Sequence, residues 1–113
     1  MFAYAYHAPI MGHRAADPFS TAEIARRLKL TRLALGYKQP MMSVLAGLSI
    51  PAQAWSNYEN GTRRISLDVA QKLHTNLGIT LHWIYRGDMN GLSEDLAAKI
   101  ALQIRDEARK ARR

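Results

Sequence analysis

Apolar residues recur at intervals of three and four along most of the chain, which is the spacing of one face of an α-helix. The first such segment follows Ser20, whose position three residues before Glu23 fits a reciprocal capping box. Its expected inward face consists of Ile24, Leu28, Thr31 and Leu35. Gly36 can adopt the left-handed conformation that ends helices. The sequence therefore predicts a helix between Ser20 and Gly36.

The opposite face of this first helix is strongly basic. It carries Arg26, Arg27, Lys29 and Arg32. Long cationic side chains are rarely buried, and a run of charges on one helix face is ordinarily solvated. We therefore expect all four side chains to lie in water.

Two short helices joined by a tight turn come next. Pro40 suits the first position of a helix over residues 40–46, because a proline there loses no helical hydrogen bond. Residues 47–49 form the turn, and the second helix covers about residues 52–60 before Gly61 stops it. The expected inward residues are Met42 and Leu45 in the first helix and Trp55 and Tyr58 in the second.

Three further helices are predicted over residues 67–77, 81–85 and 94 to about 112. Each follows a hydroxyl residue that can cap it: Ser66, Thr80 and Ser93. The last has acidic residues in its first turn and basic residues at its end, which suits the helix dipole. No segment alternates apolar and polar residues, so no sheet is expected. The predicted fold class is all-α, a five-helix domain with an extra C-terminal helix.

The pattern divides the chain into three parts. Residues 1–19 read as an irregular N-terminal arm, residues 20–87 as the five-helix domain, and residues 88–113 as the C-terminal helix with its connection. The C-terminal helix has an apolar stripe of Leu96, Ile100 and Ile104. We expect this stripe to form a dimerisation seam, with packing onto its own domain as the alternative. A seam in the arm, around Tyr4 and Tyr6, is the next choice.

Composition narrows the function. The 113 residues suit one domain, and the net charge of +7 with a pI near 10.1 favours polyanionic partners. The chain has no cysteine, which excludes disulfides and thiolate zinc sites and fits a reducing cytoplasm. No apolar run approaches the roughly 20 residues that span a bilayer. Nucleic acid is therefore the favoured partner, and no membrane is expected.

Catalytic chemistry has little support in the sequence. The four histidines are His7, His13, His74 and His82; the last two lie on different predicted helices, without a close carboxylate at ligand spacing. No phosphate-binding glycine loop and no nucleophile elbow occurs. We expect no enzymatic activity, no cofactor and no metal.

Five landmarks occur in order over more than half of the chain. They read ALGYKQ (34–39), AGLS (46–49), QAWSNYENG (53–61), ISLDVAQKL (65–73) and LHWIYRGD (81–88). In these the chain resembles the phage-repressor/Cro-like helix-turn-helix family, also called the Xre family. One departure is about two extra residues between Gly47 and Trp55, in a longer turn or at the start of the second short helix.

The resemblance implies binding of double-stranded DNA with the helix near residues 52–60 in the major groove. The side chains that it places at the base edges are Ala52, Gln53, Ser56 and Asn57. Those that it places at the DNA backbone are Gln39, Asn60, Thr62, Arg63 and, more weakly, Arg64. Glutamine and asparagine can pair with adenine N6 and N7. Glu59 is expected to support the fold, because a carboxylate beside phosphates would repel them.

Several functions remain open on these observations. A homodimeric transcriptional regulator, in the first place a repressor, is favoured. An antitoxin that binds its own operator and a toxin protein would use the same fold, and a toxin gene beside this one would distinguish it. A pure protein-interaction module fits poorly, because the predicted reading face is polar and lies beside a basic loop. Membrane-surface binding by the C-terminal helix is the weakest alternative, since that helix has no aromatic anchor.

Overall fold

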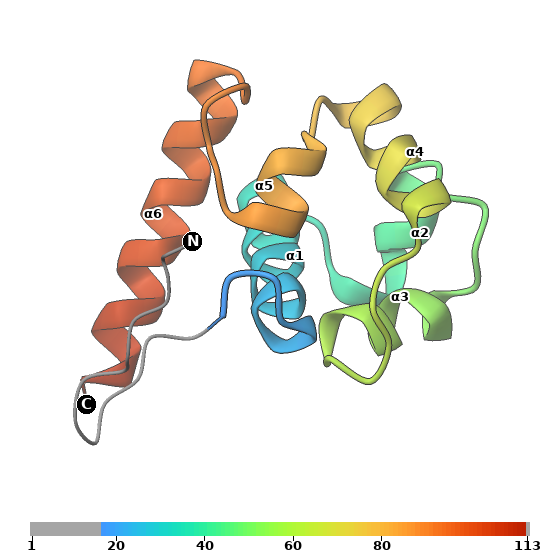
Figure 1. Ribbon diagram of the computed structural model, residues 1–113, viewed down its shortest axis with the longest axis horizontal. Helices are drawn as coiled ribbons and strands as arrows, with labels where there is room; N and C mark the ends of the chain where they lie inside the picture. Colours follow the sequence, from blue (N-terminus) through green and yellow to red (C-terminus); the bar gives the residue numbers. More distant parts are fainter. Residues whose placement is uncertain (1–16, 113) are drawn as a thin grey trace, which may run out of the picture.

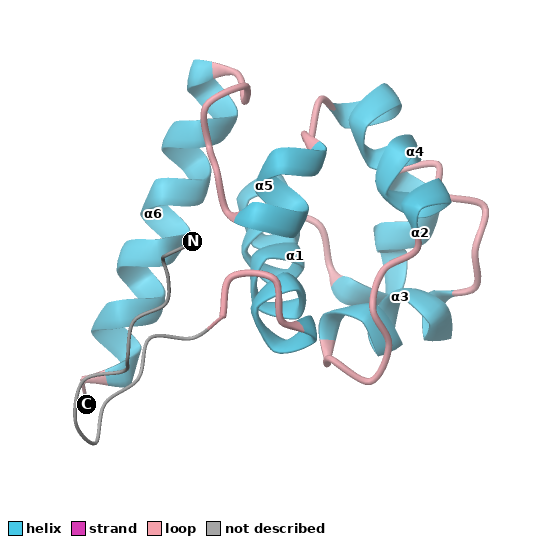
Figure 2. Ribbon diagram, viewed as in Figure 1, coloured by secondary structure: helices cyan, strands magenta, loops and turns pink. Residues whose placement is uncertain are grey.

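The computed structural model describes residues 17–112, and within that range all regular structure is helical (Figure 2). The elements are α1 (Thr21–Leu35), the 3₁₀ turn η1 (Gln39–Met41), α2 (Met42–Leu45), α3 (Ala52–Glu59), α4 (Leu67–Leu77), α5 (Leu81–Arg86) and α6 (Glu94–Ala111). The all-α fold with an extra C-terminal helix is thus confirmed. Most of the expected arm, including Tyr4, Tyr6, His7 and His13, lies outside the described residues. None of the helices in the described range is both long and apolar enough to span a membrane.

Local signals set most of the helix ends. The predicted caps Ser20, Ser66, Thr80 and Ser93 each accept a hydrogen bond from the backbone N–H three residues later. Gly36 and Gly78 take the left-handed conformation after α1 and α4, with φ of 78° and 74°. The start and end of both helices therefore fall where the sequence predicts them.

Only one half of the expected capping box at α1 forms. The Ser20 hydroxyl accepts from the Glu23 N–H, but the Ser20 N–H donates to the Asp17 carbonyl at 3.0 Å. The Glu23 carboxylate instead accepts a hydrogen bond from Arg26 at 3.2 Å. A cation one turn along the helix is a stronger partner for a carboxylate than a backbone amide is.

The prediction for the inward face of α2 is partly wrong. Met42 is buried as predicted, but the side chain of Leu45 is 49% exposed, and Ser43 and Ala46 point inward instead. The chain enters α2 through η1, and a 3₁₀ turn has about 3.0 residues per turn against about 3.6 in an α-helix. The angular position of each α2 side chain is therefore shifted from the one that a regular helix from residue 40 would give.

The prediction that all four basic side chains of α1 lie in water is also wrong for two of them, Arg27 and Arg32. Arg27 is 3% exposed; its Nε donates to the Ile84 carbonyl at 3.0 Å, and its Nη2 donates to the Pro18 carbonyl. Burial lowers the pKa of the Arg27 guanidinium. Arg32 is buried too, against α3. Both arginines are accommodated because other elements supply acceptors that no local pattern reveals.

The C-terminal helix α6 packs lengthwise on α1, on the side of α1 away from α3 (Figure 1). Leu96 and the fully buried Ile100 belong to the chain's own core, and Ile104 packs against it. Arg26 of α1 and Glu107 of α6 add an ion pair at 3.0 Å. The stripe expected as a dimer seam is therefore occupied within one chain, and the alternative, packing onto its own domain, is the correct one.

A candidate nucleic-acid interface

The helix α3 is fixed to α1 by a buried network around one carboxylate. Trp55 is fully buried, as expected, and its Nε1 donates to Glu59 Oε2 at 2.7 Å. Arg32 binds the same carboxylate through two hydrogen bonds. Its Nε donates to Oε2 and its Nη2 donates to Oε1, each at 2.8 Å. Bidentate charge-assisted bonds of this kind fix orientation as well as position. One face of α3 is thus held rigidly inward, which determines the face that it turns outward.

The outward face of α3 is uncharged and mostly polar. It consists of Ala52, Gln53, Ser56 and Asn57, of which the first two are exposed and the last two partly buried. The Nε2 of Gln53 donates to Oδ1 of Asn57 at 3.1 Å, which aligns the two amides along the helix. That bond leaves Oε1 of Gln53 as a free acceptor and Nδ2 of Asn57 as a free donor. The face therefore offers an acceptor and a donor side by side.

The turn before α3 is held by side chains from α4. Lys72 Nζ donates to the Leu48 carbonyl at 3.1 Å, and Asn76 Nδ2 donates to the carbonyls of Ala46 and Gly47 at 2.9 and 3.2 Å. These bonds satisfy three consecutive carbonyl groups that have left the helical pattern. Sequence reasoning missed both residues, because each acts on a segment at least 24 residues away and has no local signature.

Leu48 anchors the same turn from inside. Its side chain is fully buried, while the residues on either side of it, Gly47 and Ser49, have positive φ values of 64° and 56°. Gly47 adopts this conformation without strain, whereas a non-glycine residue such as Ser49 rarely does so. The chain then straightens at Pro51 and α3 begins at Ala52, the residue expected from the sequence.

The loop after α3 is folded back on the helix end. The backbone carbonyl of Asn57 accepts from the N–H groups of Thr62 and Arg63 at 3.0 and 3.1 Å. Oδ1 of Asn60 accepts from the backbone and the hydroxyl of Thr62. Within the described range, the exposed Arg63 makes no ion pair. Its guanidinium is available at the edge of the α3 face.

Two contacts fix the far end of that loop. The Tyr85 hydroxyl donates to the Ile65 carbonyl at 3.0 Å, and burial raises the pKa of this hydroxyl. Arg64 donates from Nη1 to the Phe19 carbonyl at 2.8 Å. Arg64 is therefore partly committed to the protein itself, whereas Arg63 is not.

Gln39 lies next to α3. It is the first residue of η1, which packs directly against α3, and its side chain is partly buried. No side chain caps the start of η1. The exposed Lys38 precedes it. Gln39 thus adds a polar group and Lys38 a cation close to α3.

The segment that contains α3 exposes only positive charges, because its one acidic residue is buried. Glu59 is the only carboxylate between positions 36 and 67, and it is buried and paired with Arg32. The exposed charges of that segment, at Lys38, Arg63 and Arg64, are all positive. A cationic rim around an uncharged polar helix face is complementary to the edges of DNA bases between two phosphate backbones.

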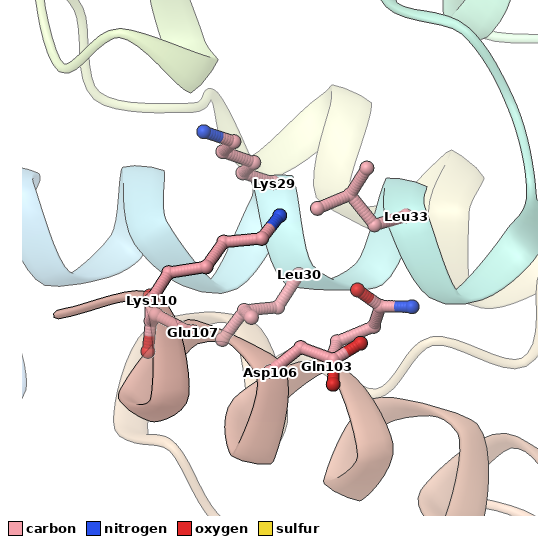
Figure 3. Close-up of a pocket in the computed structure, with 7 residues that line it drawn as sticks. All are labelled: Lys29, Leu30, Leu33, Gln103, Asp106, Glu107 and Lys110. Carbon is pink, nitrogen blue, oxygen red and sulfur yellow. The ribbon is translucent and has the colours of Figure 1, made fainter. Parts of the chain in front are cut away.

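A groove between α1 and α6 is the main alternative as a ligand site (Figure 3). It is lined by Lys29, Leu30, Leu33, Gln103, Asp106, Glu107 and Lys110, and its volume is about 150 Å³. Sites for small molecules are commonly about 300–1,000 Å³ and mostly apolar. The groove is small, and its two carboxylates already form ion pairs, Glu107 with Arg26 and Asp106 with Arg109. It is better explained as the seam between two packed helices. No group of three or more potential metal ligands occurs among residues 17–112.

A family model described as helix-turn-helix matches residues 28–84, half of the chain, from within α1 to within α5. The chain belongs to the Xre/Cro-like helix-turn-helix family. No curated protein and no solved structure matches the chain significantly. In this helix-turn-helix protein, α2, the turn and α3 form the motif, and α6 lies outside the family match. The protein is thus a DNA-binding regulator of the helix-turn-helix type.

Proposed function

We propose that this protein recognises a specific double-stranded DNA sequence by laying α3 in the major groove. The observation that carries the proposal is the outward face of α3, which is uncharged and mostly polar, in a segment (positions 37–66) whose only carboxylate is buried. The major groove is wide enough to admit one α-helix and displays a different pattern of donors and acceptors for each base pair. The five-helix domain, residues 20–87, supplies all of these contacts.

Base readout is assigned to Ala52, Gln53, Ser56 and Asn57. Their spacing along α3 places them on one side of two helical turns. The free Oε1 of Gln53 and Nδ2 of Asn57 match the N6 donor and N7 acceptor of adenine. Ala52, at the exposed start of α3, can contact a thymine methyl group. We therefore expect an A·T base pair at the position opposite Gln53 and Asn57.

Contacts to the DNA backbone are assigned to Gln39, Asn60, Thr62, Arg63 and Arg64. Arg63 contributes most, because its guanidinium is exposed and has no competing ion pair in the described part of the chain. Arg64 contributes less, because it already donates to the Phe19 carbonyl. Contacts of this kind set register and supply affinity that is independent of base sequence.

The regulatory consequence that we propose is repression by a homodimer in the cytoplasm. One recognition helix reads only a few base pairs, so a unique site requires two helices about one DNA turn apart. A protein bound over a promoter excludes polymerase without further machinery. An antitoxin would bind its operator in the same way, and only a toxin partner would distinguish it.

Selection of bound sequences from a random DNA pool tests the proposal. The full chain should enrich a two-fold symmetric site with half-site centres one DNA turn apart. Selection with Gln53→Ala should relax one base pair in each half-site, whereas Gln103→Ala, the same change on the far side of α1, should enrich the wild-type site. A pool that remains random under conditions where the protein binds DNA would contradict sequence-specific recognition.

A further inference from the structure

The loop that carries Arg63 is held by the domain at both of its ends. At the near end, the carbonyl of Asn57, in the last turn of α3, accepts hydrogen bonds from the N–H groups of Thr62 and Arg63. At the far end, the carbonyl of Ile65 accepts a hydrogen bond from the Tyr85 hydroxyl of α5 at 3.0 Å. Arg63 lies between these two anchor points, so the position of its backbone depends on both.

We propose that Tyr85 is a positioning residue for DNA binding: its hydroxyl holds the loop in the arrangement from which Arg63 reaches a phosphate group of the duplex. The inference rests on the proposed function, which assigns Arg63 to the DNA backbone. It adds a residue that need not touch DNA itself. Tyr85 is 20 residues away from Ile65 in the sequence, so no local pattern relates it to the loop.

The side chain of Tyr85 is suited to this role because both partners of its hydrogen bond are attached to the packed core. Its ring packs against the core cluster, and the acceptor carbonyl belongs to the buried Ile65. Burial raises the pKa of the Tyr85 hydroxyl above the ordinary tyrosine value of about 10, and the positive charge of Arg64 opposes this effect only in part. The hydroxyl therefore remains a hydrogen-bond donor at neutral pH.

A second contact holds the residue that follows Arg63. The Nη1 of Arg64 donates to the Phe19 carbonyl at 2.8 Å. Phe19 is itself fixed twice: its N–H donates to Oδ1 of Asp17 at 2.9 Å, and the guanidinium carbon of Arg86 lies 5.4 Å from the centre of its ring. Contacts from α5 and from the segment before α1 therefore converge on the same end of the loop.

The bond from Tyr85 to Ile65 is the stronger of the two contacts, because it is partly buried whereas the bond from Arg64 to Phe19 is exposed. If one arrangement of the loop is competent for the phosphate contact, the affinity for DNA scales with the fraction of molecules in that arrangement. One hydrogen bond shifts such an equilibrium by about two- to tenfold. Tyr85→Phe should therefore weaken binding by about two- to tenfold, on the selected site and on random duplex alike.

Amide hydrogen exchange of the full chain, measured by NMR in the absence of DNA, tests whether Tyr85 holds the loop. In Tyr85→Phe the amides of Thr62 and Arg63 should exchange faster than in the wild type, whereas the amides within α3 should exchange as before. Tyr37→Phe is the matched control, because it removes a hydroxyl that forms no hydrogen bond among the described residues from another partly buried tyrosine. Unchanged exchange at Thr62 and Arg63 in Tyr85→Phe would overturn the inference, whatever the protein does with DNA.

A double-mutant cycle in DNA binding tests whether Tyr85 acts through Arg63. Tyr85→Phe should weaken binding and flatten its salt dependence in the wild-type background, but change little in the Arg63→Ala background, because the contact that it positions is already absent. Equal losses in the two backgrounds would overturn the positioning role. An Arg63→Ala protein that binds DNA as the wild type does would overturn the assignment of Arg63, and this inference with it. The exchange experiment reports on the loop alone, so the two failures are distinguishable.

Discussion

At the scale of single residues, Glu59 couples the fold to the proposed function. Its carboxylate binds Arg32 and the Trp55 indole, so it fixes the rotation of α3 against α1. The same burial removes the only negative charge from the segment that carries the proposed DNA contacts. If Glu59 were exposed, its carboxylate would repel phosphate. Because it is buried, it instead positions α3 for the proposed contact with DNA.

Removal of this carboxylate should be costly for stability. Glu59→Ala leaves Arg32 buried without its counter-charge, and breaking a buried pair in this way costs about 3–5 kcal/mol. Urea denaturation should show this loss in the free energy of unfolding. Glu107→Ala is the control, because it breaks a half-exposed pair with Arg26 and should cost less than about 1 kcal/mol. Equal effects of the two changes would show that the buried network does not stabilise α3.

Arg63 should act on DNA affinity and leave base preference unchanged. Arg63→Ala removes one cation from the proposed phosphate contacts, so binding to the selected site and to random duplex should weaken by a similar factor. The slope of log affinity against log salt should fall by about one unit. Arg112→Ala, at the far end of α6, serves as a control of equal charge. A loss confined to the selected site would place Arg63 at a base edge.

At the scale of elements, the turn between α2 and α3 depends on α4. The carbonyls of Ala46, Gly47 and Leu48 all accept bonds from Lys72 or Asn76. The turn is long enough to move if these bonds are lost, and α3 would move with it. Accurate placement of a recognition helix therefore relies on residues that need not contact DNA.

Asn76→Ala should separate specific from general DNA binding. The change removes two hydrogen bonds, one part-buried and one exposed, with an expected loss of about 0.5–1.5 kcal/mol in folding stability. Because the start of α3 is loosened, affinity for the selected site should fall more than affinity for random duplex. Asn90→Ala, in the loop before α6, is the matched control and should change neither. If specific and random binding fall together, Asn76 supports the fold but does not position α3.

The elements also show why some of the fold was predictable. The bounds of α1 and α4 follow from a capping hydroxyl and a left-handed glycine, and the start of α6 follows from the Ser93 cap, all of which are local signals. The inward face of α2 could not be predicted, because η1 shifts its phase. Burial of Arg27 and Arg32 was missed because their acceptors lie 57 and 27 residues away.

At the scale of the whole molecule, α6 completes the core of the chain's own domain. The spacing of Leu96, Ile100 and Ile104 correctly predicts a buried stripe, but it does not say what covers the stripe. The structure assigns that role to the chain's own domain. The face of α3 proposed to read DNA was expected from the family resemblance, whereas Lys72 and Asn76 required the three-dimensional packing.

The central claim is that the outward face of α3 reads bases. The most direct test is the dissociation constant of the wild type and of Gln53→Ala for the selected site, for a site changed at one base pair, and for random duplex, all at one salt concentration. Wild type should prefer the selected site by about 10³-fold or more. Gln53→Ala should lose about 1–3 kcal/mol on that site, lose discrimination at one base pair and bind random duplex as before. Equal losses on all three duplexes would contradict the assignment of α3 as the reading helix.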